Sequence, residues 1–313
     1  MQVFFVMAGI TNVPSTLIFR KYIYQKSKRL LIPYVFYGIV LLLLGAILPT
    51  HIELSKGFLG ILYGRYSIFP PSIDNNIPLL QACGYLSPFW FIPCIFLSYV
   101  LLAWYDHSKR PITIIVLAIV VSCFTPLLPI LLPWSIEMAF IGFLLMLCGR
   151  AVRSTLLEAP ARSNRRFYIH LFIWIACIIV YIIAWKVDGP INMSLSEIGN
   201  TTIPFPFRFL FFSLLGISET VFLSICFKTI QESILTRCMA YVGRHALRLL
   251  CIHLFIGECV YFLLAEYSLP KFISFGCAVV VIFVVDYILE YFLHYLESAF
   301  SKKATCNIPA ENH

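Results

Sequence analysis

The sequence is poor in charged residues. Only 12% of its 313 residues are Asp, Glu, Lys or Arg, about half of the roughly 25% that is typical of soluble domains. So little charge excludes an ordinary cytosolic enzyme. In contrast, 60% of the residues are hydrophobic, and several apolar runs reach about 18 residues, a length typical of transmembrane helices. These features predict an all-α, polytopic integral membrane helix bundle.

The sequence also lacks the short motifs of several soluble chemistries. It contains no Gly-rich phosphate loop, no HExxH and no GxSxG, so nucleotide-binding, zinc-protease and hydrolase chemistry have no support. The eleven cysteines lie mostly inside apolar runs without a CxxC pair, and we expect neither a metal site nor a bound cofactor. The formal charge of +8 does not form a basic stretch interleaved with exposed aromatics, so nucleic acid is not an expected partner.

Nine apolar segments are candidates for transmembrane helices, although the first and fifth are short. Each approaches the roughly 20 residues that cross a hydrocarbon core of about 30 Å. Pro129 and Pro133 interrupt the hydrogen-bond ladder between the fourth and fifth segments, which are therefore predicted to form a hairpin. The run Gly57–Tyr63 is too short to span, and we expect it to lie in the interface or to re-enter the bilayer. The nine segments are residues 1–19, 30–50, 88–105, 112–132, 135–149, 167–186, 207–227, 247–265 and 272–295.

Lysine and arginine are divided unequally between alternate loops. Of the 23 such residues, 18 fall in one set of loops and 5 in the other, so the positive-inside rule places the first set in the cytoplasm. The C-terminus is then inside and the N-terminus outside. The start has no signal-peptide features, so we expect one more helix before Met1. The five outer residues are Lys56, Arg65, Lys186, Arg208 and Lys271.

We expect residues 1–300 to form a single transmembrane domain and residues 301–313 a short polar cytoplasmic tail. Near the end of this domain, Asp286, Glu290 and His294 recur every four residues and share one face of a helix. Ionisable groups in a membrane segment are candidates for function. Arg244 and Arg248 are their expected partners, in a structural ion-pair seam or in a functional site.

Four segments, in order along most of the chain, carry motifs of one known family. Residues 4–9, FFVMAG, resemble its FFxxSG helix, and residues 26–34, KSKRLLIPY, resemble its basic (K/R)xxR-LLxPY motif. Residues 89–93, FWFIP, look like its LWFLP motif, and residues 243–253, GRHALRLLCIH, are similar to its GxNSLxIYLLH segment. The chain thus resembles the acyltransferase 3 family, integral-membrane acyltransferases that decorate bacterial envelope polysaccharides.

The resemblance implies ten helices in a bacterial inner membrane and an acyl-CoA donor, acetyl-CoA above all, bound from the cytoplasm. It implies transfer of the acyl group to a hydroxyl of an envelope polysaccharide or of its lipid-linked sugar precursor. The alternative is a transporter or flippase for a lipid-linked sugar, using carboxylates such as Glu219, although no internal repeat supports it.

This sequence also departs from the family pattern. Ala8 replaces the Ser of the first motif, and His245, Ala246 and Leu250 replace the Asn, Ser and Tyr of the last. The family's first helix carries a basic residue and, eleven residues later, a His regarded as essential, and the resemblance begins after this point. We therefore expect this form of the chain to be inactive in transfer.

The resemblance also nominates site residues. Lys26 and Arg29 match the basic motif and, three residues apart, present two cations to the donor phosphates. Arg150 and Arg248 are added as donor-binding candidates because they are expected at the same level of the membrane. Trp90 matches the aromatic residue of LWFLP and is expected to line the acyl or acceptor path.

His253 matches the terminal His of the late motif and is the catalytic candidate. An imidazole buried in a membrane helix can move protons near neutral pH or hydrogen-bond a neighbouring helix. The choice between a base and a scaffold stays open at this point.

The charge distribution makes the orientation testable. A cysteine introduced at Arg162 should resist a membrane-impermeant thiol reagent in intact cells, because the positive-inside rule places it in the cytoplasm. A cysteine at Lys186, on the opposite side, is the matched control and should react. Strong external labelling at position 162 would overturn the orientation.

Overall fold

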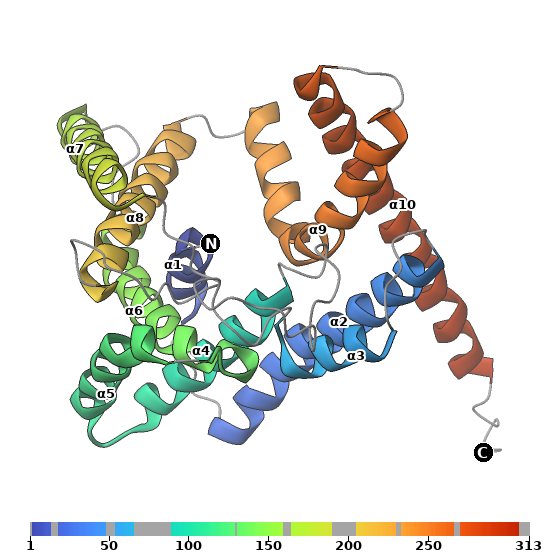
Figure 1. The fold of residues 1–313 in the computed structure, drawn as a ribbon, viewed down its shortest axis with the longest axis horizontal. Helices are drawn as coiled ribbons and strands as arrows, with labels where there is room; N and C mark the ends of the chain where they lie inside the picture. The colour runs from blue at the N-terminus through green and yellow to red at the C-terminus, as the bar shows by residue number, and fades with distance from the viewer. Residues whose placement is uncertain are drawn as a thin grey trace, which may run out of the picture. The chain divides into compact units, whose positions relative to one another are not determined.

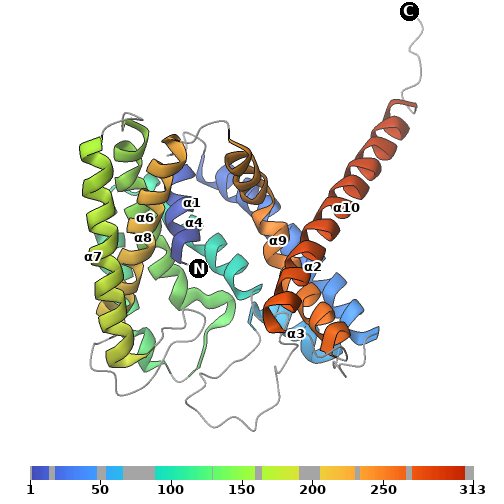
Figure 2. The ribbon, with the colours of Figure 1, turned by 90° about the horizontal axis from the view of Figure 1, so that it is seen from above.

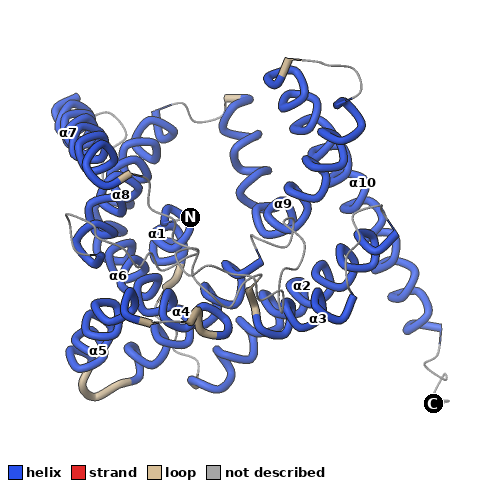
Figure 3. Tube along the Cα trace, viewed as in Figure 1, coloured by secondary structure: helices blue, strands red, loops and turns tan. Residues whose placement is uncertain are grey.

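The computed structural model describes residues 2–13, 18–47, 54–65, 89–128, 130–158, 164–189, 205–229, 233–265 and 270–306. Within these ranges all regular secondary structure is helical (Figures 1 and 3). The predicted all-α class is therefore confirmed.

Each of the nine predicted apolar segments contains a helix, and a short additional helix, α3, covers the run that was expected not to span. The α-helices are α1 (Gln2–Thr11), α2 (Phe19–Ile47), α3 (Leu54–Tyr63), α4 (Phe91–His107), α5 (Pro111–Phe124), α6 (Ile136–Glu158), α7 (Asn164–Asp188), α8 (Phe205–Thr229), α9 (Ile234–Ala265) and α10 (Lys271–Cys306). Two 3-10 turns, η3 (Thr125–Leu127) and η4 (Pro133–Ser135), lie between α5 and α6.

Several helix boundaries differ from the apolar runs. In the described part of the first run, the helix before Phe19 is the ten-residue α1, which ends at Thr11. The second helix extends back to Phe19, so Lys26 and Arg29 stand on it. The last helix continues to Cys306, and residues 301–306 of the expected tail are therefore helical.

Five described helices are long and apolar enough to cross a membrane. Four further apolar helices have 10 to 17 described residues, and a ten-residue helix rises only about 15 Å, half of a hydrocarbon core. The structure therefore supports an integral membrane bundle of long and short helices. The five long spans are Phe19–Ala46, Pro133–Arg153, Phe167–Val187, Ile234–Leu264 and Lys271–Phe292.

The chain divides into two compact units, Met1–Ala240 and Tyr241–His313. In the first unit α6 is the shared partner, because α1, α4, α5 and α8 all pack against it. Figure 2 shows α6, α8 and α7 side by side. The contact of α5 with α6 confirms the predicted hairpin. The second unit consists mainly of α9 and α10.

The packing of α1 on α6 depends on glycine. Phe5 and Val6 of α1 are fully buried. A Cβ atom on Gly9 would lie 2.0 Å from the Met146 carbonyl oxygen, and one on Gly149 would lie 2.1 Å from the Val6 carbonyl oxygen. The two backbones therefore approach as closely as in small-residue helix pairs of other membrane proteins.

Gly149→Ala should destabilise the first unit by about 1–3 kcal/mol, because the added methyl forces the α1 and α6 backbones apart. Gly276→Ala in α10 is the matched control, since a Cβ atom there meets nothing within 4 Å, and alanine is the better helix former. The measurement is thermal unfolding of both purified variants in detergent. Equal melting temperatures would contradict the close approach.

Candidate functional site

A basic cluster forms where α2, α4 and α6 meet in the first unit. Lys26 on α2 places its Nζ atom 3.8 Å from the centre of the Tyr99 ring on α4. The Tyr22 ring, one turn earlier on α2, lies 5.4 Å from the same ammonium group. Two aromatic faces therefore stabilise the lysine charge through cation–π interactions.

Arg150 joins this cluster from α6. Its Nη1 and Nη2 atoms donate to the two carboxylate oxygens of Asp106 on α4, at 2.5 and 2.8 Å. Both side chains are mostly buried, at 13% and 15% exposed, so the bidentate pair holds α4 and α6 together. Arg29 and Arg150 are both close enough to Lys26 for their positive charges to repel its ammonium group. The structure thus brings Lys26, Arg29 and Arg150, three of the four predicted donor-binding residues, into one cluster.

The cluster carries donors that the described part of the chain does not satisfy. Arg150 Nε and Arg153 Nη1 are buried and have no hydrogen-bond partner among the described residues. Asp106 is the carboxylate paired with the cluster, so positive charge is in excess. Buried guanidinium groups with free N–H donors are suited to bind an anion such as a phosphate.

Arg153 and Asp106 were not predicted as site residues. Arg153 stands three residues after Arg150 on α6, the same spacing that singled out Lys26 and Arg29 on α2. This spacing could therefore have identified Arg153 as a site residue from the sequence. Asp106 has no comparable signal, because its partner lies 44 residues away in the chain.

Trp90 lies at the far end of α4 from the basic cluster. It directly precedes α4, is only 3% exposed, and its ring centre is 6.1 Å from that of Phe91. Sixteen residues of helix separate it from Asp106, which corresponds to about 24 Å. Its predicted role on the acyl path is therefore distinct from donor-phosphate binding.

A second charged group lies at the other end of α6 from Arg150. Arg65, just after α3, pairs through Nη2 with Glu137 in the first turn of α6, and the side chains are 3% and 0% exposed. Arg65 Nε also donates to the Leu132 carbonyl oxygen at 3.0 Å. Neither residue was predicted as a site residue. Thirteen residues of α6 separate Glu137 from Arg150, or about 20 Å.

Reciprocal hydrogen bonds tie α3 to the turn before α6. The Tyr63 hydroxyl donates to the Leu131 carbonyl oxygen at 2.6 Å, and Trp134 Nε1 donates to the Leu62 carbonyl oxygen at 2.8 Å. Trp134 and Ser135 have φ angles of 57° and 54°, a left-handed backbone that costs of order 1–3 kcal/mol per residue. We call these bonds, with the Arg65–Glu137 pair, the outer clasp, after the side of the membrane on which the positive-inside rule predicts Arg65.

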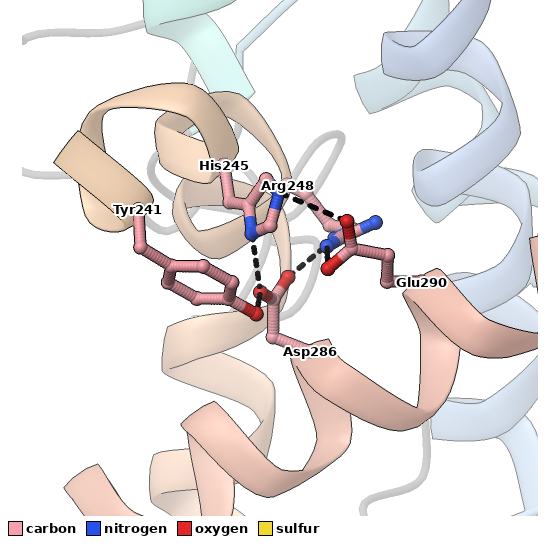
Figure 4. A network of polar contacts seen from close by, with 5 residues as sticks. All are labelled: Tyr241, His245, Arg248, Asp286 and Glu290. Carbon is pink, nitrogen blue, oxygen red and sulfur yellow. Dashed lines mark hydrogen bonds and ion pairs between the residues drawn. The ribbon is translucent and has the colours of Figure 1, made fainter. Parts of the chain in front are cut away.

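A third polar group lies within the second unit, between α9 and α10 (Figure 4). Asp286 is fully buried and accepts hydrogen bonds from the Tyr241 hydroxyl at 2.9 Å, from His245 Nδ1 at 3.1 Å and from Arg248 Nε. Glu290 lies 3.4 Å from His245 Nε2 and 3.6 Å from Arg248 Nη2.

This network confirms Arg248 as the predicted partner of Asp286 and Glu290. Arg248, the fourth predicted donor-binding residue, is therefore engaged by two carboxylates within the second unit. His245, which replaces the Asn of the family motif, joins the same network. The side chain of His294 lies outside the described residues.

His253 stands five residues beyond Arg248 on α9, about one and a half helical turns past this network. Its Nδ1 atom lies 2.9 Å from the Leu250 carbonyl oxygen and 3.2 Å from that of Leu249. Carbonyl oxygens only accept hydrogen bonds, so Nδ1 carries the proton. Nε2 makes no hydrogen bond within the described part of the chain.

Comparison with known proteins decides the family. The profile of the acyltransferase 3 family, described as an acyltransferase domain, matches residues 1–291. The chain belongs to this family. The match includes all four motif segments that carried the resemblance. No curated protein and no solved structure gives a significant match. Together with the long apolar helices, family membership makes the protein an integral-membrane acyltransferase.

Asp286→Asn in this acyltransferase should lower the free energy of unfolding by about 3–5 kcal/mol, because the Arg248 charge loses its buried partner. Glu290→Gln is the matched control. The Glu290 side chain is 45% exposed, so we expect a loss of about 1 kcal/mol or less. Unfolding of both variants by denaturing detergent gives the comparison. Equal losses would show that Asp286 does not hold the network together.

Proposed function

We propose that this acyltransferase moves an acetyl group from acetyl-CoA, bound from the cytoplasm, to a hydroxyl of an envelope polysaccharide or of its lipid-linked sugar precursor. It would act in the bacterial inner membrane as an O-acyltransferase. The observation that carries the proposal is the basic cluster of Lys26, Arg29 and Arg150.

The basic cluster matches the chemistry of coenzyme A. The donor carries several phosphate groups, and a phosphate binds best to fixed cations and to guanidinium N–H donors. Asp106 orients Arg150 from one side, while Arg150 Nε and Arg153 Nη1 keep donors that no described residue uses. Tyr99 holds the Lys26 ammonium in place. The cluster is thus organised before the donor arrives, which reduces the entropic cost of binding.

The distribution of charge supports cytoplasmic loading. The basic cluster lies at the ends of α2, α4 and α6 that adjoin the lysine- and arginine-rich loops, and the positive-inside rule assigns these loops to the cytoplasm. Acyl-CoA is present on that side. Trp90, at the opposite end of α4, would line the path of the acyl group.

Acyl transfer needs a group that accepts the proton of the attacking hydroxyl. The hydroxyl oxygen forms a bond to the thioester carbonyl carbon, the carbon–sulfur bond breaks, and the proton ends on the released thiol. His253 is the candidate base, because it matches the terminal His of the family's late motif and an imidazole nitrogen can accept a proton.

Arg29→Ala should weaken acetyl-CoA binding by about 1.5–3 kcal/mol, since a hydrogen bond to a charged group contributes about that much. Lys28→Ala is the matched control: this lysine is exposed on α2, as Arg29 is, but adjacent residues of a helix face different sides, so it does not share the face of Lys26 and Arg29. The measurement is equilibrium binding of labelled acetyl-CoA to each purified, folded variant. Unchanged affinity in Arg29→Ala would refute the donor site.

A further inference from the structure

Glu137 of the outer clasp has an unused carboxylate oxygen. Oε1 pairs with Arg65, and the backbone amides of Leu132 and Glu137 also stabilise the negative charge of the carboxylate. Oε2 is buried and has no hydrogen-bond partner among the described residues. A buried carboxylate oxygen without a partner is costly, so its retention requires an explanation. A purely structural ion pair does not require this arrangement.

Ser135 presents a second group of the same kind. The Ser135 side-chain oxygen is also buried and has no hydrogen-bond partner within the described ranges. Ser135 as a whole is fully buried. The left-handed backbone at Trp134 and Ser135 persists because the outer clasp holds it. Strained residues held in this way cluster at ligand sites.

The two groups together select the chemistry of the ligand. The Glu137 carboxylate repels anions, and the neighbouring Arg65 guanidinium disfavours cations. A serine hydroxyl can donate a hydrogen bond, while a carboxylate oxygen can only accept one. A neutral hydroxyl, which accepts one hydrogen bond and donates another, satisfies both.

The position of the pair agrees with a substrate that arrives from the opposite side to the donor. Glu137 and Arg150 stand at opposite ends of α6, about 20 Å apart. This separation is comparable to the length of an extended pantetheine arm, so a donor with its phosphates near Arg150 can direct its thioester toward Glu137.

We propose that Glu137, supported by Ser135, binds and orients the hydroxyl of the acyl acceptor at the outer clasp. This role rests on the proposed function. Arg65 is a positioning residue that holds Oε1 and so aims Oε2 at the acceptor.

The test compares Glu137→Gln with the double variant Arg65→Met/Glu137→Gln. The single variant leaves Arg65 buried without its charged partner and is expected to unfold more easily. The double variant removes both charges and should fold, yet it still lacks the carboxylate. Glu258→Gln, an exposed carboxylate on α9, is the matched control. Because this form of the chain is expected to be inactive in transfer, each variant is made in a form extended upstream by the helix that the family resemblance implies. Each purified protein is then assayed for melting temperature, for acetyl-CoA binding and for transfer of labelled acetyl to isolated bacterial envelope polysaccharide.

We expect the double variant to have the same melting temperature as the wild type and to bind acetyl-CoA with unchanged affinity. Its kcat/KM for the polysaccharide should fall about 10- to 100-fold, the effect of losing one hydrogen bond to a charged group. Glu258→Gln should transfer at the wild-type rate.

If the folded double variant transferred acetyl at the wild-type rate, the inference would be overturned, because the clasp would then be structural only. The proposed function would stay intact. Loss of acetyl-CoA binding in the double variant would also overturn it, since Glu137 would then act on the donor. If the wild type bound acetyl-CoA but acetylated no polysaccharide, the proposed function would fail and the acceptor role with it.

Discussion

Buried charges in this membrane protein must be paired, and their pairing holds one helix to the next. A charge in a low-dielectric environment is costly unless an opposite charge and hydrogen bonds compensate it. Asp106 and Arg150 join α4 to α6, Arg65 and Glu137 join the end of α3 to α6, and Asp286 and Arg248 join α9 to α10. With only 12% charged residues, each such pair has a large share in specifying which helices meet.

In the first unit this constraint acts through α6. Its glycines let α1 approach to backbone contact, its last turns carry Arg150 and Arg153, and its first turn carries Glu137. A rigid helix thus sets the separation between a cation-rich end and an end with a buried carboxylate. Under the proposed function, donor chemistry and acceptor chemistry would then be organised from one element.

Much of this arrangement was predictable from sequence, and the rest was not. Periodic apolar runs predicted the helices, and the spacing of Lys26 and Arg29 predicted a cation pair on one helical face. The repeat of Asp286 and Glu290 led to Arg248 as a partner, because both helices are neighbours in the chain. Arg65 and Glu137 escaped prediction. They are 72 residues apart in the chain, and no local pattern relates the end of a short helix to a distant turn.

The sequence by itself determined the all-α membrane class and the acyltransferase 3 family, because hydropathy and short motifs are properties of neighbouring residues. Only the tertiary structure decided which charges meet. It placed Arg150 against Asp106 beside Lys26, engaged Arg248 with two carboxylates, and left one oxygen of Glu137 without a hydrogen-bond partner among the residues that the structure describes. The physical reason is that ion pairing depends on distance in space, and helix packing, such as that of α1 and α4 on α6 and of α3 on α2, sets that distance.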